Sequence, residues 1–90
     1  MIQARTISLG VRYYAYLTQE SGMSVGGEAP YPGWYKKYIP VMIEGEHTKY
    51  YVCKVLPHMD AYGGITPPYN VTIDKWHIEQ GIFKIFEIDK

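Results

Sequence analysis

Residues 30–38 hold the side chains best suited to bind another molecule, because four aromatic rings and two lysines lie close together there. Flat rings stack on bases, sugars or proline rings, and lysine ammonium groups pair with phosphates or carboxylates. Two prolines and a glycine constrain the segment. It therefore predicts a binding surface for a partner or a ligand, made by Tyr31, Trp34, Tyr35, Lys36 and Lys37. Trp34 has a second interpretation, in which its indole closes an open end of the fold.

A second Gly/Pro-rich segment, residues 57–68, carries further candidates for the same surface. Glycine and proline interrupt any regular period, so this segment is expected to be a loop. We expect the two loops to lie near the same end of the domain. The second loop and the residue that follows it would then complete the surface with His58, Tyr62 and Tyr69.

The chain has ten tyrosines and only two phenylalanines. A buried phenol needs a hydrogen-bond partner, so phenylalanine serves a core better than tyrosine. An excess of tyrosine indicates rings with one apolar side and one wet end, which are common at binding surfaces.

The residue pattern predicts no catalytic site, cofactor or metal. A nucleophilic cysteine needs an exposed turn and a nearby base, whereas Cys53 lies in a strand-like run and is expected to be a buried structural thiol. A metal site needs three or four converging ligands, but the pairs His58/Asp60 and Asp74/His77 offer two each. The histidines are expected in solvated loops or turns: His47, His58 and His77. The sequence brings no two of four further carboxylates into one cleft for acid–base chemistry: Glu44, Glu46, Glu79 and Glu87.

Length and charge narrow the class of protein. Ninety residues predict one domain, residues 1–90, with one small core. Nine basic and nine acidic residues cancel, which argues against nonspecific binding to nucleic acid. A single cysteine excludes an internal disulfide and favours a reducing, cytoplasmic location. The chain shows neither the order of a signal peptide nor a long apolar run, so we expect a complete small protein without a membrane span.

Residues 7–18 alternate apolar and polar side chains, which predicts a long strand with one buried face. Residues 19–37 lose this pattern and predict a long loop. Residues 38–43 and 48–56 are rich in β-formers and predict a hairpin joined by residues 44–47. Pro40 lacks a backbone donor, so its strand is expected at an edge or with a bulge there.

Residues 69–73 predict a short strand, followed by one helical turn over residues 74–80. Asp74 is expected to cap this turn, and Gly81 to end it in the left-handed region. Residues 82–88 have apolar side chains at both parities and predict a central strand covered on both faces. The expected core consists of Ile7, Leu9, Val11, Val41, Val52, Val71, Ile73, Phe83 and Ile85.

This order of elements predicts a mainly β fold, either a small antiparallel five-stranded sheet or an SH3-like barrel, with one helical turn before the last strand. The likeness to that barrel is one of topology alone and assigns no function.

The tyrosine-rich composition, the neutral net charge and the single small domain favour a small non-enzymatic binding protein that modulates or inhibits a larger protein. This is the kind of protein that phages and mobile elements encode. Three alternatives stay open: an oligomeric protein that binds or sequesters a small nucleotide-like ligand, an enzyme using scattered His, Asp and Glu, and a structural or virion protein. A concave aromatic pocket with lysine and histidine would favour the ligand. We expect a homo-oligomer, because a small chain rich in aromatic rings tends to bury some of them between subunits.

Overall fold

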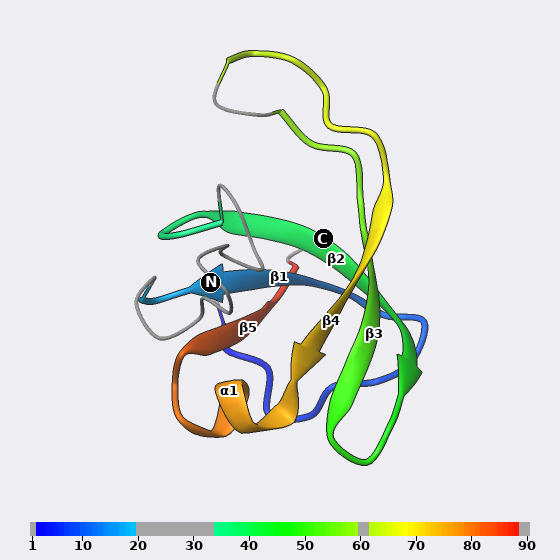
Figure 1. The fold of residues 1–90 in the computed structure, drawn as a ribbon, viewed down its shortest axis with the longest axis vertical. Coiled ribbons are helices and arrows are strands. Elements are labelled where there is room, and N and C mark those ends of the chain that lie inside the picture. Colours follow the sequence, from blue (N-terminus) through cyan, green and yellow to red (C-terminus); the bar gives the residue numbers. More distant parts are fainter. Residues whose placement is uncertain (1, 20–33, 60–61, 89–90) are drawn as a thin grey trace, which may run out of the picture.

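Five strands form one antiparallel sheet in the order β4-β3-β2-β1-β5, as Figure 1 shows. The computed structural model describes residues 2–19, 34–59 and 62–88. The elements are β1 (Arg12–Leu17), β2 (Tyr38–Glu46), β3 (Tyr50–Val55), β4 (Tyr69–Asp74), α1 (Lys75–Glu79) and β5 (Phe83–Glu87). The predicted mainly β fold with a helical turn before the last strand is therefore confirmed. The end strands β4 and β5 are not hydrogen-bonded neighbours, so the sheet is open and a closed barrel is not confirmed.

The core lies on one face of this twisted sheet. Side chains of alternate residues on a strand point to opposite faces, and one face of every strand contributes buried apolar residues to a single cluster. The cluster joins Ile73 of β4 to Phe83 and Ile85 of β5, although these strands end the sheet on opposite sides. The sheet therefore curls around its own core, and α1 packs against strands from both ends.

The first strand is shorter than the alternating pattern predicts. β1 begins only at Arg12, because Gly10 adopts a left-handed backbone with φ of 76° and turns the chain before it. Tyr13 is buried, and its hydroxyl accepts a hydrogen bond from the Ser8 backbone N–H at 2.9 Å. The predicted core positions Leu9 and Val11 are wrong, since both side chains are exposed.

The other core predictions are partly confirmed. Four of the nine residues are buried: Val41, Ile73, Phe83 and Ile85. Ile7 and Val71 are half-buried and pack against the core cluster. The prediction that Val52 belongs to the core is wrong, because the neighbouring Cys53 points into the core and is completely buried. Successive residues of β3 face opposite sides, so the side chain of Val52 lies on the other face of the sheet.

The predicted hairpin is confirmed, but its turn is residues 47–49 instead of 44–47. β2 extends to Glu46, and the register between β2 and β3 shifts between Ile43 and Gly45. The edge position predicted from Pro40 is wrong, because β2 lies between β1 and β3. Proline is tolerated there because its position falls opposite the end of β3. The Pro40 carbonyl accepts a hydrogen bond from the Leu56 N–H at 2.9 Å, one residue beyond that strand.

The C-terminal end of the helical turn is as predicted, but its N-terminal cap is not. Gly81 has φ of 77°, and the N–H groups of Gly81 and Ile82 bond to the carbonyls of Ile78 and His77. These two bonds form a Schellman cap. Asp74 occupies the N-cap position, but its carboxylate makes no capping hydrogen bond.

β5 is not a central strand, which corrects the prediction from its two apolar faces. It is the last strand of the sheet, and its outer edge is covered by residues 2–4. The Ala4 N–H bonds to the Ile85 carbonyl at 2.8 Å, and the Glu87 N–H bonds to the Ile2 carbonyl at 2.7 Å. Phe86, at the opposite parity from Phe83 and Ile85, packs among aromatic rings on the outer face instead of in the core. Within the described residues, no helix is both long and apolar enough to cross a membrane.

Candidate functional site

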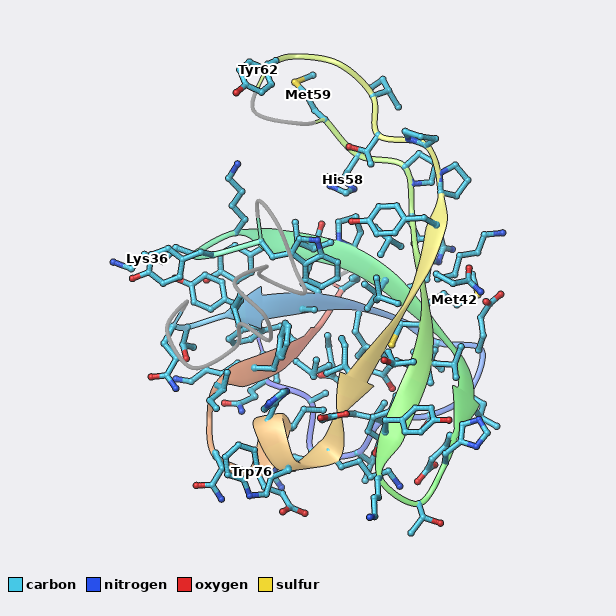
Figure 2. All side chains as sticks on the ribbon, in the orientation of Figure 1. Lys36, Met42, His58, Met59, Tyr62 and Trp76 are labelled. Carbon is cyan, nitrogen blue, oxygen red and sulfur yellow. The ribbon has the colours of Figure 1, made fainter. Side chains whose placement is uncertain are left out.

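The predicted residues Tyr35, Lys36 and Lys37 form a tight exposed turn before β2. The turn is tied to the end of β1, because the Lys36 N–H bonds to the Leu17 carbonyl at 2.9 Å. Lys36 has φ of 57°, a left-handed conformation that non-glycine residues adopt seldom. Its ammonium lies 5.4 Å from the centroid of the Tyr35 ring. All three side chains are exposed, and Lys36 extends away from the sheet in Figure 2. The turn therefore presents a ring and two positive charges to solvent.

Trp34 lies in the core, which selects the second of its two interpretations. Its indole is 2% exposed and packs edge-on against Phe83, with ring centroids 6.1 Å apart. The indole N–H donates a 3.0 Å hydrogen bond to the hydroxyl of Tyr69. Trp34 therefore closes one side of the core and presents almost no surface to a partner. Tyr31 lies outside the described residues.

The second predicted loop is an arm that continues the β3–β4 hairpin. We use "arm" for residues 56–59 and 62–68, the part of this segment that the structure describes. The Thr66 N–H bonds to the His58 carbonyl at 2.8 Å, and Met59 forms an antiparallel bridge with Ile65. His58 Nδ1 lies 2.8 Å from the Leu56 carbonyl oxygen, so the imidazole interacts with the backbone of the arm. Figure 1 shows the arm projecting from the domain, away from α1.

Large apolar side chains are exposed near the tip of the arm. Met59 is 69% exposed, Tyr62 is 97% exposed and Ile65 is 68% exposed. The sequence prediction included Tyr62 but missed Met59 and Ile65. Their signal was present, since both are apolar residues in a segment where proline and glycine exclude a buried strand.

The structure does not bring the predicted residues into one patch. Tyr62 lies at the far end of the arm, whereas Lys36 lies at one side of the sheet, as Figure 2 shows. Tyr69 lies at the start of β4, where it holds Trp34. The candidates divide into an arm, a turn and a core contact.

The sheet face opposite the core carries four packed aromatic rings, none of which is among the predicted binding residues. We call it the aromatic face, and its rings are Tyr14, Tyr16, Tyr38 and Phe86. The rings of Tyr16 and Tyr38 have centroids 4.7 Å apart, and Phe86 packs edge-on at 5.7 Å from Tyr38. Tyr14 packs edge-on at 6.2 Å from Tyr38. Tyr38 follows the exposed turn directly, so turn and face are continuous.

A groove of about 650 Å³ lies between the β2–β3 turn and α1, at the opposite end of the hairpin from the arm. The His47 ring stacks on Tyr50, with centroids 4.7 Å apart. On the other side Trp76 is 58% exposed, and Figure 2 shows its ring at the surface of the helical turn. The remaining lining residues are polar or charged: Thr48, Lys49, Asp74, Lys75 and Glu79.

Part of the charge beside this groove is already paired. The Lys75 ammonium lies 2.7 Å from a Glu46 carboxylate oxygen and 5.1 Å from the centroid of the Tyr51 ring. Burial, and after it the Glu46 charge, raises the pKa of Tyr51. His77 Nδ1 is buried and has no hydrogen-bond partner in the described part of the chain, and the nearest Asp74 oxygen is 3.9 Å away. Lys49 is exposed and has no ion pair among the described residues.

Cys53 is buried, as expected of a structural thiol. Burial, with a smaller contribution from Glu44, raises the pKa of Cys53 to about 12, so the thiol stays protonated at neutral pH. Thiols react as thiolates, and this one is therefore inert in the native fold. In the described part of the chain, no three His, Cys, Asp or Glu residues are grouped as metal ligands would be.

Comparison of the chain with protein-family models, with curated proteins and with solved structures found no match.

Proposed function

We propose that this protein is a non-enzymatic binding module that modulates a larger protein, and that its arm inserts into an apolar site on that partner. The observation that carries the proposal is the exposure of Met59, Tyr62 and Ile65 on an arm whose two sides are bridged at Met59 and Ile65. Large apolar side chains lose favourable burial when they remain in water. Exposed apolar patches commonly mark interaction sites.

The residue types on the arm fit protein recognition. Methionine adapts to irregular pockets because it is unbranched and polarizable. Tyrosine supplies a large contact area and a hydroxyl for hydrogen bonding. The hydrogen bond from the Thr66 N–H to the His58 carbonyl and the bridge between Met59 and Ile65 constrain the arm in advance, which lowers the entropy lost on binding.

The test compares arm variants with equally exposed apolar residues elsewhere. Tagged wild type, Met59→Ser, Tyr62→Ser and Ile65→Ser are used to capture partners from a lysate, and the affinity for the protein captured by wild type is then measured. The controls are Leu9→Ser and Ile2→Ser, whose side chains are 61% and 62% exposed. We expect at least one arm variant to bind about tenfold more weakly, equivalent to about 1.4 kcal/mol. The proposal is wrong if every arm variant retains the partner as well as the controls do.

A second copy of the chain is the competing occupant of the arm site. Self-association was expected from the sequence and stays a prediction. Light scattering at about 100 µM protein distinguishes the two cases, because dimerisation by mass action grows with concentration. A dimer that becomes a monomer in the Tyr62→Ser variant would place the second copy, instead of a foreign partner, on the arm.

One observation favours the nucleotide-like ligand as a second candidate function. The groove beside α1 is concave and combines the rings of Tyr50 and Trp76 with Lys49. Aromatic rings stack on bases, and an ammonium pairs with phosphate. Calorimetric titration with ATP tests this candidate, with Trp76→Ala and Lys49→Ala as the variants expected to weaken binding. No heat of binding at millimolar ATP would exclude affinities tighter than about 1 mM.

A further inference from the structure

We propose that the aromatic face is a second interaction surface, and that it binds an acidic segment of a protein. This inference is independent of the arm. It rests on the sheet register, on basic side chains around the four rings that form no ion pair with any described residue, and on the way those rings pack.

The register places cations around the rings. Residues opposite each other in an antiparallel pair lie on the same face of the sheet. Lys84 lies opposite Tyr16, which lies opposite Tyr38. At the other end of the face, Met42 lies opposite both Arg12 and Lys54. Basic side chains therefore flank the aromatic cluster at both ends.

The exposed turn adds two more cations, Lys36 and Lys37, beside Tyr38. The only ion pairs among the described residues are Lys75–Glu46 and His77–Asp74. None of the five basic side chains around the rings takes part in one there: Arg12, Lys36, Lys37, Lys54 and Lys84. One described carboxylate, that of Glu44, lies at the Arg12 and Lys54 end of this face, because it accepts a 3.3 Å hydrogen bond from Asn70, which lies opposite Lys54. The basic side chains on the face and the adjoining turn still outnumber it. Charge complementarity therefore favours an anionic partner.

The packing of the rings distinguishes a protein partner from a nucleic acid. Bases stack on the open faces of aromatic side chains. Here three of the four rings are half-buried, and they cover one another edge-on or tilted, with Phe86 at 65° to Tyr38 and 85° to Tyr16. Only Tyr38, at 49%, is widely exposed. The nine basic and nine acidic residues of the chain also cancel, whereas nucleic-acid binders rely on a cationic excess.

A protein segment that carries carboxylates and a few apolar side chains would complement both the basic rim and the apolar centre of the aromatic face. Carboxylates would meet the basic rim, where hydrogen bonds to charged groups are strong. Apolar side chains would cover Pro40, Met42 and the ring edges, which form the centre. A hydrophobic centre with a polar rim is the usual organisation of a protein–protein interface.

The experiment uses a labelled 12-residue peptide of glutamate and leucine, a matched peptide with glutamine in place of glutamate, and a dT12 oligonucleotide. Binding is followed by fluorescence anisotropy at low salt. We expect the acidic peptide to bind about tenfold more tightly than the glutamine peptide, and to weaken as salt screens the charges. The proposal is overturned if the two peptides bind alike, if neither binds, or if dT12 binds more tightly than the acidic peptide.

Two variants locate the binding on this face. Lys84→Glu reverses a charge beside Tyr16, and Lys49→Glu makes the same change on an exposed, unpaired lysine at the groove end. We expect Lys84→Glu to weaken peptide binding about fivefold or more and Lys49→Glu to change it less than about twofold. Equal losses would show that the peptide responds only to net charge and would overturn the proposal.

Tyr38→Ala supplies a readout that does not depend on charge. We expect this variant to bind the peptide more weakly, with little change in its unfolding midpoint. The arm variants should bind the peptide normally, so failure here and failure of the arm proposal are separable.

Discussion

The indole N–H of Trp34 donates a 3.0 Å hydrogen bond to the hydroxyl of Tyr69. Trp34 precedes β2, and Tyr69 begins β4, which is separated from β2 by β3 in the sheet. This bond connects two residues 35 positions apart in the chain across the curled sheet. A large ring from a glycine- and proline-rich segment therefore fills the core, and a tyrosine predicted to bind a partner serves to hold it.

Replacing either residue should reveal this structural role. Trp34→Ala removes a buried ring and should lower the free energy of unfolding by about 3–5 kcal/mol. Tyr69→Phe removes only the acceptor of one hydrogen bond and should cost about 1 kcal/mol. Urea unfolding measures both changes. An unchanged midpoint for Trp34→Ala would show that the indole is not part of the core.

Truncating a valine to alanine should lower the free energy of unfolding by different amounts on the two faces of the sheet. Val41 is completely buried, whereas Val52 lies half-buried on the opposite face. Val41→Ala should therefore cost about 1–3 kcal/mol, and Val52→Ala less than about 1 kcal/mol. Chemical denaturation of the pair checks the assignment of faces, and a larger loss for Val52→Ala would reverse it.

The buried thiol should make the fold less stable at high pH. The pKa of Cys53 is raised from 9.0 to about 12 in the folded chain. The unfolded chain therefore releases this proton first, and the stabilising effect, complete below pH 9.0, is lost as pH rises toward 12. The slope from one such group is at most about 1.4 kcal/mol per pH unit.

Unfolding curves between pH 9.0 and about 12 measure this slope, because in that range only the unfolded chain ionises the thiol. Tyr51, whose pKa is also raised, adds a slope of the same sign. Cys53→Ala keeps the main causes of the raised Tyr51 pKa, burial and Glu46, and removes only the smallest, Cys53 itself, so the difference between the two slopes comes mainly from the thiol. Equal slopes for wild type and Cys53→Ala would contradict the prediction.

Two glycines provide a matched pair for backbone strain. Gly81 has φ of 77°, and nothing lies within 4 Å of an added Cβ, so the cost of Gly81→Ala would come from the backbone alone. We expect a loss of about 1–2 kcal/mol. At Gly45 an added Cβ would lie 3.6 Å from Val52 Cβ, an ordinary contact, and φ is not positive. Gly45→Ala should therefore be tolerated, and thermal unfolding of both variants distinguishes the two positions.

The strands and the helical turn could be read from the sequence because they rest on local rules. Alternation at Tyr13, Ala15 and Leu17 identified the buried face of β1, and the left-handed Gly81 ended α1 as expected. The prediction of Val52 failed because β3 carries apolar side chains at both parities, so local hydrophobicity did not reveal that the parity of Cys53 and Val55 faced the core.

The binding surfaces were only partly accessible to sequence reasoning. Residue type identified Tyr35, Lys36 and Tyr62, which are exposed. It missed the aromatic face because its rings come from β1, β2 and β5, and only pairing in the sheet brings them together. Cross-strand neighbours depend on register, which a single strand does not specify.

The sequence by itself determined a single mainly β domain, its hairpin, its helical turn and an abundance of tyrosines, because period-two patterns and turn residues act over a few positions. Only the tertiary structure decided what each aromatic ring does. Curling of the sheet placed Trp34 in the core, and extension of the β3–β4 hairpin exposed Tyr62 on the arm. The physical reason is that burial depends on contacts between segments distant in the chain, and these form only when the whole sheet is assembled.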